Sequence, residues 1–456
     1  MCISELISVD ASFLRAVLPG DILKFFQMGS STLLIKGEPG TGKTTLALTL
    51  ASLLPSRRVF YLTTRVSGED LLTQFPWVKE RTDTVSVIDL RLGTPEIFLE
   101  KFMEGLRTEA SLVILDSWDA FAEPLDHAER LKTEGAMVSL TSSRTSSSRV
   151  IFVSESEATT KLDYMVDGVV TLKCGDLGGR ALRRMEIKKL RGAEVSQRIQ
   201  LFTLKGGKAN VFSPYGEPDY SRASAFQPVK DEDSQVSLGA PVLDSAFGRL
   251  RRGSVFVIEY QSCVPYSALR LLATPPQVNF INLGRAAVTL PLFGSEVHIF
   301  EKTFRAMLSG ISAQEKHLVL LKNGLSQEES LDDREKMLSI FEEKTEEIRK
   351  NSADGLVMNV VSVTRFERMF LSETRHLMRV LGRIIDRAQN KGDILLFYLP
   401  SESETRDMLR SVATKHVRLD VVAGIVLVWG EKPFTPLYAV EPDRSNPFLP
   451  SLTPIL

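Results

Sequence analysis

The chain alternates short runs of consecutive apolar residues with segments whose apolar positions recur at helical spacing. Four runs in the first half predict strands: "RRVFYLTT" (57–64), "ASLVILDSWDAF" (110–121), "SRVIFVSESE" (148–157) and "MVDGVVTLK" (165–173). Between the first two lies "TPEIFLEKFMEGLR" (94–107), which predicts an amphipathic helix with a proline at its start. Apolar strands that alternate with helices are typical of a mostly parallel sheet covered on both faces. The first half therefore predicts an α/β domain.

The segment "KGEPGTGKTTLAL" (36–48) carries the spacing G-x-x-x-x-G-K-[ST] of a phosphate-binding loop. Its glycines let backbone N–H groups turn toward phosphate oxygens, Lys43 is placed to reach the β- and γ-phosphates, and Thr44 is placed to offer a hydroxyl to Mg²⁺. An apolar run precedes the loop and a helix-forming run follows it, so a chance glycine-rich turn is the less favoured interpretation. The residues predicted to bind nucleotide here are Gly37, Glu38, Pro39, Gly40, Thr41, Gly42, Lys43, Thr44 and Thr45.

The second half repeats the order of elements about 220 residues later. The run "RRGSVFVIEY" (251–260) matches the strand before the phosphate loop, and "QEESLDDREKMLSIFEEKTEEIRK" (327–350) predicts a helix ahead of the run "GLVMNVVSVTRF" (355–366). Further on, "DILLFYLPSESET" (393–405) resembles "RVIFVSESEAT", and "VVAGIVLVWG" (421–430) resembles "MVDGVVTLK". We predict a domain over 1–215, a polar linker over 216–235 and a second domain over 236–456.

The second copy lacks the phosphate-binding chemistry of the first. A gapless superposition of the two loop regions puts Tyr266 at the place of Lys43, and tyrosine and proline at the places of two loop glycines. The same register puts Val361 at the place of Asp116, which ends the apolar run "SLVILD" of the first copy. An apolar side chain cannot help to bind Mg²⁺, so we predict a degenerate domain.

Composition limits the function classes. The chain has 456 residues, of which 43% are hydrophobic and 25% charged, as in globular proteins. A net charge of -1 gives no overall electrostatic attraction to nucleic acid or to an anionic membrane. Three cysteines without framework spacing favour a reducing, cytoplasmic setting, and the N-terminal segment lacks the features of a secretory signal. The scattered histidines do not predict a structural metal site.

Several motifs together resemble the KaiC-like branch of the RecA-type ATPases. They are "GEPGTGKTT", "VILDS" as the Walker B strand, "MVDGVVTLK", "MEIKKLRG" (185–192) and, in the second copy, "LGAPVLDSAFGRLRRGSVFVIE" (238–259). The stretch "FYLTTRVSGEDLLTQFPW" (60–77) more narrowly resembles the archaeal gas-vesicle regulatory protein D family. The resemblance implies an α/β fold of two tandem RecA/KaiC-like domains, with ATP and Mg²⁺ as ligands. It also implies a protein that restrains a transcriptional activator.

The resemblance assigns roles to particular residues. Lys43 and Asp116 match catalytic residues, and Thr44 and Asp116 match the Mg²⁺ ligands. Lys189 and Arg191 match a basic pair that reaches the γ-phosphate of a neighbouring subunit, which implies a homo-oligomer; the alternative is that they are solvated charges on a hairpin.

One departure concerns the catalytic base. KaiC-like ATPases carry two glutamates after the second strand, the first of which activates water. Their place is taken here by Arg65 and Val66, and an arginine cannot act as a base. Arg65 is instead predicted to strengthen nucleotide binding. Glu69, about one turn further along, is the alternative base and the less favoured one, because a base must lie within hydrogen-bond reach of the water.

The leading hypothesis is an ATP-binding regulatory switch, at most a slow ATPase, that controls a protein partner. The alternative is a RecA-type DNA recombination or repair ATPase. It is favoured only by the arginine-rich hairpin and by "SLTSSRTSSSR" (139–149), and the near-neutral charge argues against a nucleic-acid partner. A kinase that acts on itself or a partner is a third class, with weak support from the same serine-rich segment. No membrane partner is expected, because no run approaches the roughly 18 apolar residues of a membrane span.

Overall fold

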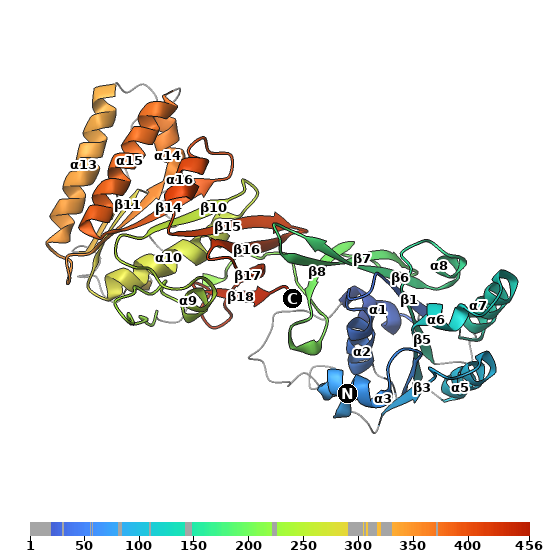
Figure 1. The fold of residues 1–456 in the computed structure, drawn as a ribbon. Helices are drawn as coiled ribbons and strands as arrows, with labels where there is room; N and C mark the ends of the chain where they lie inside the picture. The colour runs from blue at the N-terminus through green and yellow to red at the C-terminus, as the bar shows by residue number, and fades with distance from the viewer. Residues whose placement is uncertain are drawn as a thin grey trace. The chain divides into compact units, whose positions relative to one another are not determined.

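The computed structural model describes residues 20–29, 32–54, 56, 58–80, 84–108, 111–141, 148–220, 226–290, 304, 307–308, 317–320, 331–370 and 373–456. The chain divides into two units (Figure 1). Unit 1 runs to Ser213 and also includes Pro454–Leu456, and unit 2 is Pro214–Thr453. Several predicted segments reach beyond the described residues, among them most of the serine-rich stretch 139–149, part of the linker predicted over 216–235 and the first residues of the helix predicted over 327–350.

Unit 1 is built on one sheet whose order, among the described residues, is β3-β2-β4-β5-β1-β6-β7-β8-β9. The strands from β3 to β6 run parallel, and those from β6 to β9 run antiparallel. The strands are β1 (Thr32–Lys36), β2 (Arg58–Thr63), β3 (Val85–Asp89), β4 (Ser111–Asp116), β5 (Arg149–Ser154), β6 (Gly168–Asp176), β7 (Ala181–Leu190), β8 (Ile199–Thr203) and β9 (Asn210–Val211).

Helices cover both faces of this sheet (Figure 1). The helices are α1 (Gly20–Gln27), α2 (Lys43–Leu53), α3 (Gly68–Gln74), α4 (Pro76–Lys79), α5 (Pro95–Arg107), α6 (Trp118–Ala122), α7 (His127–Thr141) and α8 (Lys161–Met165). Alternate residues of β4 enter two different cores: Leu112 and Ile114 pack with α1 and α2, whereas Val113 and Leu115 pack with α5 and α6. This explains why the sequence of β4 is apolar without interruption.

Unit 2 repeats the topology, with the order β12-β11-β13-β14-β10-β15-β16-β17-β18 among its described strands. The strands are β10 (Val255–Tyr260), β11 (Ala286–Leu290), β12 (Leu318–Leu320), β13 (Val357–Ser362), β14 (Ile394–Pro400), β15 (Lys415–Val422), β16 (Ile425–Lys432), β17 (Tyr438–Pro442) and β18 (Pro450–Pro454). The helices are α9 (Pro241–Phe247), α10 (Tyr266–Asn282), α13 (Leu331–Arg349), α14 (Val363–Met369), α15 (Thr374–Lys391) and α16 (Arg406–Val412). The predicted fold, two tandem α/β domains with mostly parallel sheets, is confirmed.

Three sequence-based predictions differ from the structure. The run 421–430 does not correspond to β6; the strand beside β10 is β15, and the residues from Ile425 onward form β16, the counterpart of β7. The two strands of such a hairpin are both apolar, so the sequence pattern could be aligned with either one. The ladders also correct the position of Val361: Asp116 and Ile35 both pair with Val153, whereas Ser362 and Ile258 both pair with Tyr398. Ser362, not Val361, therefore stands at the place of Asp116.

The third difference concerns the predicted linker over 216–235. Its described residues lie against unit 2: the ring of Tyr220 stacks on Phe448, and Phe226 is buried in the core. The backbone N–H of Val229 donates to Asn279 Oδ1 at 2.7 Å. A few aromatic residues are enough to hold this polar, proline-containing stretch on the domain that follows it.

Equivalent ion pairs of opposite polarity lie beneath the two loop regions. In unit 1, Lys36 at the end of β1 is 2% exposed and pairs with Asp163 of α8 at 2.9 Å. In unit 2, Glu259 occupies the place of Lys36, is fully buried and pairs with Arg410 of α16 at 2.6 Å. His416 Nε2 lies 2.9 Å from the same carboxylate. Burial would raise the pKa of Glu259, but hydrogen bonds from His416 and Arg410 lower it to about 2.

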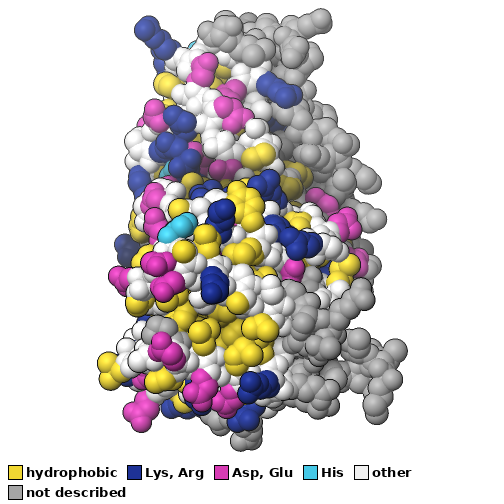
Figure 2. Space-filling model, turned by 90° about the vertical axis from the view of Figure 1, so that its right-hand side faces the viewer, with side chains coloured by type: hydrophobic (Ala, Val, Ile, Leu, Met, Phe, Trp, Pro, Cys, Tyr) yellow, Lys and Arg dark blue, Asp and Glu magenta, His cyan; other side chains and the backbone are white. Residues whose placement is uncertain are grey.

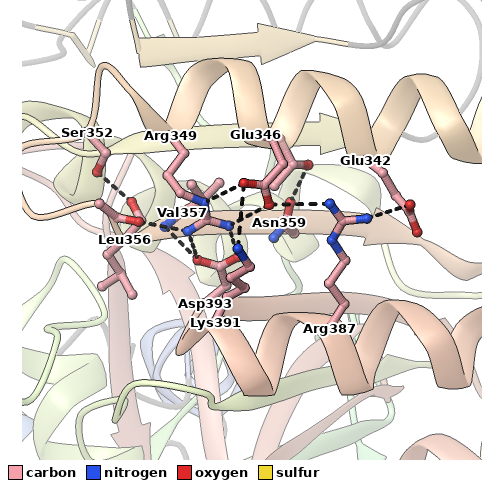
Figure 3. Close-up of polar contacts among 12 residues, drawn as sticks. Glu342, Glu346, Arg349, Ser352, Leu356, Val357, Asn359, Arg387, Lys391 and Asp393 are labelled. Carbon is pink, nitrogen blue, oxygen red and sulfur yellow. Dashed lines mark hydrogen bonds and ion pairs between the residues drawn. The ribbon is translucent and has the colours of Figure 1, made fainter.

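A second charged network joins α13 to α15 in unit 2 (Figure 3). Arg349 donates to both oxygens of Asp393, at 2.7 and 2.6 Å. Arg387 of α15 donates to Glu342 of α13 at 2.5 Å. These groups satisfy one another across the helix pair, so the network fixes the packing of the two helices on the sheet.

The surface of unit 1 carries charges of both signs. Figure 2 shows lysine, arginine, aspartate and glutamate side chains interspersed with hydrophobic ones over one face of the molecule. Among the described residues, none of the helices is long and apolar enough to cross a membrane.

The Glu259 cluster predicts a pH-dependent stability of unit 2. Glu259→Gln should lower the free energy of unfolding by about 1–3 kcal/mol near neutral pH, because it leaves the buried His416 and the partly exposed guanidinium of Arg410 without their shared carboxylate. A carboxyl whose pKa is depressed on folding stabilises above its unfolded pKa of 4.5 and loses that contribution as the pH falls toward about 2. The difference between variant and unaltered protein should therefore shrink over that range. Hydrogen exchange of peptides from β10 and β15 in urea, corrected for intrinsic exchange rates, measures this difference in the free energy of unfolding.

The matched control is Glu347→Gln, which makes the same chemical change at a glutamate of α13 that is 62% exposed. It should change stability little at any pH. A constant difference between Glu259→Gln and the unaltered protein from neutral to acid pH would contradict the assignment.

Candidate nucleotide-binding site

The phosphate loop connects β1 to α2, as the sequence predicts. Its glycines adopt backbone angles that side chains rarely tolerate: φ is 150° at Gly37, 78° at Gly40 and 99° at Gly42. A Cβ at Gly37 would lie 2.4 Å from the carbonyl oxygen of Leu172 on β6. The loop therefore needs glycine at Gly37 for space as well as for conformation, and it opens directly onto the first turn of α2.

Lys43 is the first residue of α2 and is almost fully buried. Its ammonium donates to the carbonyl oxygen of Glu38 at 2.9 Å, and the Thr41 hydroxyl donates to the same oxygen at 2.8 Å. Burial lowers the pKa of Lys43, while the negative charges of Glu155 and Asp116 act in the opposite direction. The cation thus lies within the loop and under the influence of nearby carboxylates.

Asp116 lies beside the first turn of α2. Its Oδ2 accepts a hydrogen bond from the Thr44 hydroxyl at 2.6 Å and another from the Tyr61 hydroxyl of β2 at 2.5 Å. Burial, followed by the charge of Asp116, raises the pKa of Tyr61 well above its ordinary value, so the phenol remains a donor. Tyr61 therefore orients the carboxylate that pairs with Thr44.

These residues fit Mg²⁺ bound together with a nucleotide. Mg²⁺ in such sites takes one or two protein oxygens and completes its shell with water and phosphate oxygens. A hydroxyl and a carboxylate side by side supply that protein share. Among the described residues, no cluster of three or more histidine, cysteine, aspartate or glutamate side chains could hold a metal ion without such phosphates.

Arg65 follows β2 at the same edge of the sheet. The N–H of the preceding Thr64 donates to the carbonyl oxygen of Asp116 at 3.0 Å, which fixes this turn against the end of β4. The Arg65 guanidinium forms a two-point ion pair with Glu155, with Nη2 to Oε2 at 2.5 Å. Glu155 follows β5, and its own N–H donates to Asp119 Oδ2 at 2.6 Å.

Glu69, the predicted alternative base, lies in the first turn of α3, and its side chain is exposed. The charges that act most strongly on Lys43 come from Glu155, Asp116, Arg65 and Asp119, and Glu69 is not one of them. The structure thus brings together Lys43, Thr44, Asp116 and Arg65. The glutamate beside them is Glu155 and not Glu69.

Lys189 and Arg191 lie at the end of β7, next to the beginning of β6. Lys189 pairs with Val169 in the β6–β7 ladder and donates to the carbonyl oxygen of Asp163 at 3.0 Å. Arg191 pairs with Asp167 at 3.4 Å, and its side chain is 62% exposed. The ladder places Asp167 and Gly168 beside the start of β1, whereas the phosphate loop follows its end. Arg191 therefore lies toward the end of β1 that is opposite the phosphate loop, whereas Lys189 binds the same α8 residue whose side chain pairs with Lys36.

Two residues near the loop were not predicted from the sequence. Glu155 became visible only through the strand order, which sets β5 between β4 and β1. Arg183 of β7 belongs to the arginine-rich hairpin, and its Nη1 donates to the carbonyl oxygen of Gly40 at 3.0 Å and its Nε to that of Leu456 at 2.5 Å. The antiparallel pairing of β7 with β6 carries it to the loop, which residue counting could not reveal.

The corresponding place in unit 2 is filled by the chain itself. α10 begins at Tyr266 as α2 begins at Lys43, in agreement with the gapless superposition. Ser267, at the place of Thr44, donates to Glu217 Oε1 at 3.0 Å and accepts from the Tyr215 hydroxyl at 3.2 Å. Burial raises the pKa of Tyr215 far above its ordinary value. In unit 1 the Thr44 hydroxyl is placed to meet Mg²⁺. Its counterpart in unit 2, the Ser267 hydroxyl, is instead hydrogen-bonded to two side chains of unit 2.

Comparison with known proteins agrees with this arrangement. Residues 22–188 match the family described as "GvpD gas vesicle protein, P-loop domain". Over the whole chain, the protein is 26% identical to Protein GvpD2 and 24% identical to Protein GvpD1 of Halobacterium salinarum, with 96% of each chain covered in both comparisons. A P-loop domain is a nucleotide-binding domain. The resemblance expected from the sequence is thereby confirmed: the chain is similar to the GvpD proteins along nearly its whole length, and residues 22–188 of its first unit match their P-loop domain.

Proposed function

We propose that this protein is an ATP-binding regulatory switch, in which nucleotide bound to unit 1 controls the interaction with a protein partner. The observation that carries the proposal is the hydrogen bond of Thr44 to Asp116 beside a phosphate loop with Lys43 in place. Binding of ATP with Mg²⁺ needs these groups. The similarity to GvpD gas vesicle proteins supports a role in the regulation of gas vesicles. The family resemblance stated for the sequence implies that the partner is a transcriptional activator, which the protein would restrain.

Slow hydrolysis is part of the proposal. Rapid hydrolysis needs a carboxylate that orients and deprotonates water, and the usual place for it holds Arg65. The carboxylate that the structure sets beside Lys43, Glu155, has both of its oxygens paired with Arg65 and is therefore not free to orient water. ATP would then persist as a bound ligand that marks a state of the protein and stabilises unit 1 by mass action.

Unit 2 serves the partner rather than the nucleotide in this proposal. The Ser267 hydroxyl, which corresponds to that of Thr44, is hydrogen-bonded to Tyr215 and Glu217. Ser362 stands at the place of Asp116, the proposed Mg²⁺ ligand. A domain that keeps its sheet and cores but has filled its ligand site is suited to docking. Lys189 and Arg191 are proposed to act on a neighbouring subunit, because the exposed Arg191 lies toward the end of β1 that is opposite the loop of its own chain.

Nucleotide binding should be confined to unit 1. Lys43→Ala should weaken ATP binding by about a hundredfold or more, because it removes a charge-assisted contact to phosphate. Tyr266→Ala changes the equivalent position of unit 2 and should have little effect. Titration of the full-length variants with a fluorescent ATP analogue measures both affinities. Equal losses in the two variants would contradict a degenerate second site.

Hydrolysis should be slow although binding is tight. We expect about 10⁻³ to 10⁻¹ turnovers per second, from a typical rate reduced by about 10²–10⁴ for a missing base. A phosphate-release assay on the purified protein tests this. Vigorous turnover that disappears in Lys43→Ala would refute the slow switch. Turnover that survives Arg65→Ala and vanishes in Glu69→Gln would identify Glu69 as the base.

Partner binding should depend on the nucleotide. The protein should retain the gas-vesicle transcriptional activator of its own organism to a different extent with ATP and Mg²⁺ than with ADP, by at least severalfold. Lys43→Ala should abolish the difference, and Tyr266→Ala should preserve it. Quantitative co-purification of the two proteins measures retention. Equal retention in all nucleotide states would overturn the switch, even if ATP binding itself were confirmed.

A further inference from the structure

The ion pair between Arg65 and Glu155 spans the end of β4. The strand order β2-β4-β5-β1 sets Asp116 between these two residues, and the ladder pairs Ser154 with Lys36, so that Glu155 follows β5 where Gly37 follows β1. The pair therefore joins the turn after β2 to the edge of the phosphate loop. Its two members lie on either side of the carboxylate that meets Thr44.

Both members are held by their backbones but not enclosed. Thr64, next to Arg65, is fixed to Asp116, and the Glu155 N–H is fixed to Asp119. The Arg65 side chain is nevertheless 49% exposed and that of Glu155 24% exposed. An arginine side chain with an anchored backbone and an accessible head can exchange one anion for another at little structural cost.

The third phosphate of ATP binds at the lysine of this loop. The charges of both Glu155 and Arg65 act on Lys43, so the pair lies within the electrostatic range of that phosphate. A phosphate offers the guanidinium the same two-point geometry as the carboxylate, with more charge. ADP lacks the γ-phosphate and so has no group at this place that could compete with Glu155 for the Arg65 guanidinium.

We propose that Arg65 distinguishes ATP from ADP and that Glu155 is its built-in competitor: the γ-phosphate of ATP takes the guanidinium from Glu155, whereas ADP leaves the ion pair intact. This inference rests on the proposed nucleotide site and names the residues that read its state. The breaking of the Arg65–Glu155 pair connects the number of phosphates to the loops after β2 and β5. Glu155 thus sets how much ATP is favoured over ADP.

The test is a double-mutant cycle on the full chain. The dissociation constants of ATP and of ADP, each with Mg²⁺, are measured by calorimetry for the unaltered protein, Glu155→Gln, Arg65→Ala and the double variant. Glu155→Gln should raise the affinity for ATP about tenfold, and that for ADP much less, because Arg65 no longer has to leave a carboxylate. Arg65→Ala should lower the preference for ATP over ADP. In the double variant, Glu155→Gln should have no further effect on that preference.

The control is Glu157→Gln. Glu157 lies two residues further along, is 35% exposed and faces Lys173 at 3.7 Å, so its removal subtracts the same charge without touching Arg65. It should shift ATP and ADP affinity alike. Thermal unfolding of each variant verifies that the fold is intact.

Three results would overturn the inference while the nucleotide site stands: equal effects of Glu155→Gln on ATP and ADP, a gain that persists without Arg65, or the same gain from Glu157→Gln. Failure of the unaltered protein to bind either nucleotide would overturn the proposed function itself.

Discussion

The parallel register of β2, β4, β5 and β1 is the constraint on which the candidate site depends. Ladder pairing aligns Asp116 with Thr63 on one side and with Val153 on the other, and it aligns Lys36 with Ser154. The residues that follow these positions all emerge at one edge of the sheet. A slip of one residue in β4 would turn Asp116 toward the opposite face and remove the partner of Thr44. Two-sided burial of the β4 side chains makes such a slip costly, so the core that forms the sheet also fixes the chemistry at its edge.

Sequence patterns were sufficient for features that are local. The phosphate loop depends on consecutive residues, and Asp116 is recognisable because an acidic residue ends an apolar run. Arg65 could be placed because it follows the next strand along the chain. Glu155 could not, because its importance arises from the adjacency of β5 to β1, strands that lie more than 100 residues apart in the sequence. The same holds for Arg183, which an antiparallel ladder brings to Gly40.

The predicted linker shows where composition misleads. A stretch rich in proline and charge usually lacks the apolar area to offset the entropy of ordering. Here Tyr215, just before the predicted linker, and Tyr220 and Phe226 within it supply that area, while Glu217 and Asp219 are exposed. Tyr215 also donates a hydrogen bond to Ser267, which stands at the place of Thr44. The segment therefore belongs to the fold of unit 2 and cannot be treated as an independent spacer.

The two units share a topology but not the polarity of their buried ion pairs. Lys36 meets Asp163 in unit 1, and Glu259 meets Arg410 in unit 2, at equivalent places between the central strand and the helix before the next strand. An exchange of these helices between the two units would set Lys36 against Arg410 and Glu259 against Asp163. Like charges buried at contact distance cost several kcal/mol. The reversed polarity of the two ion pairs therefore disfavours such an exchange of helices between the two units.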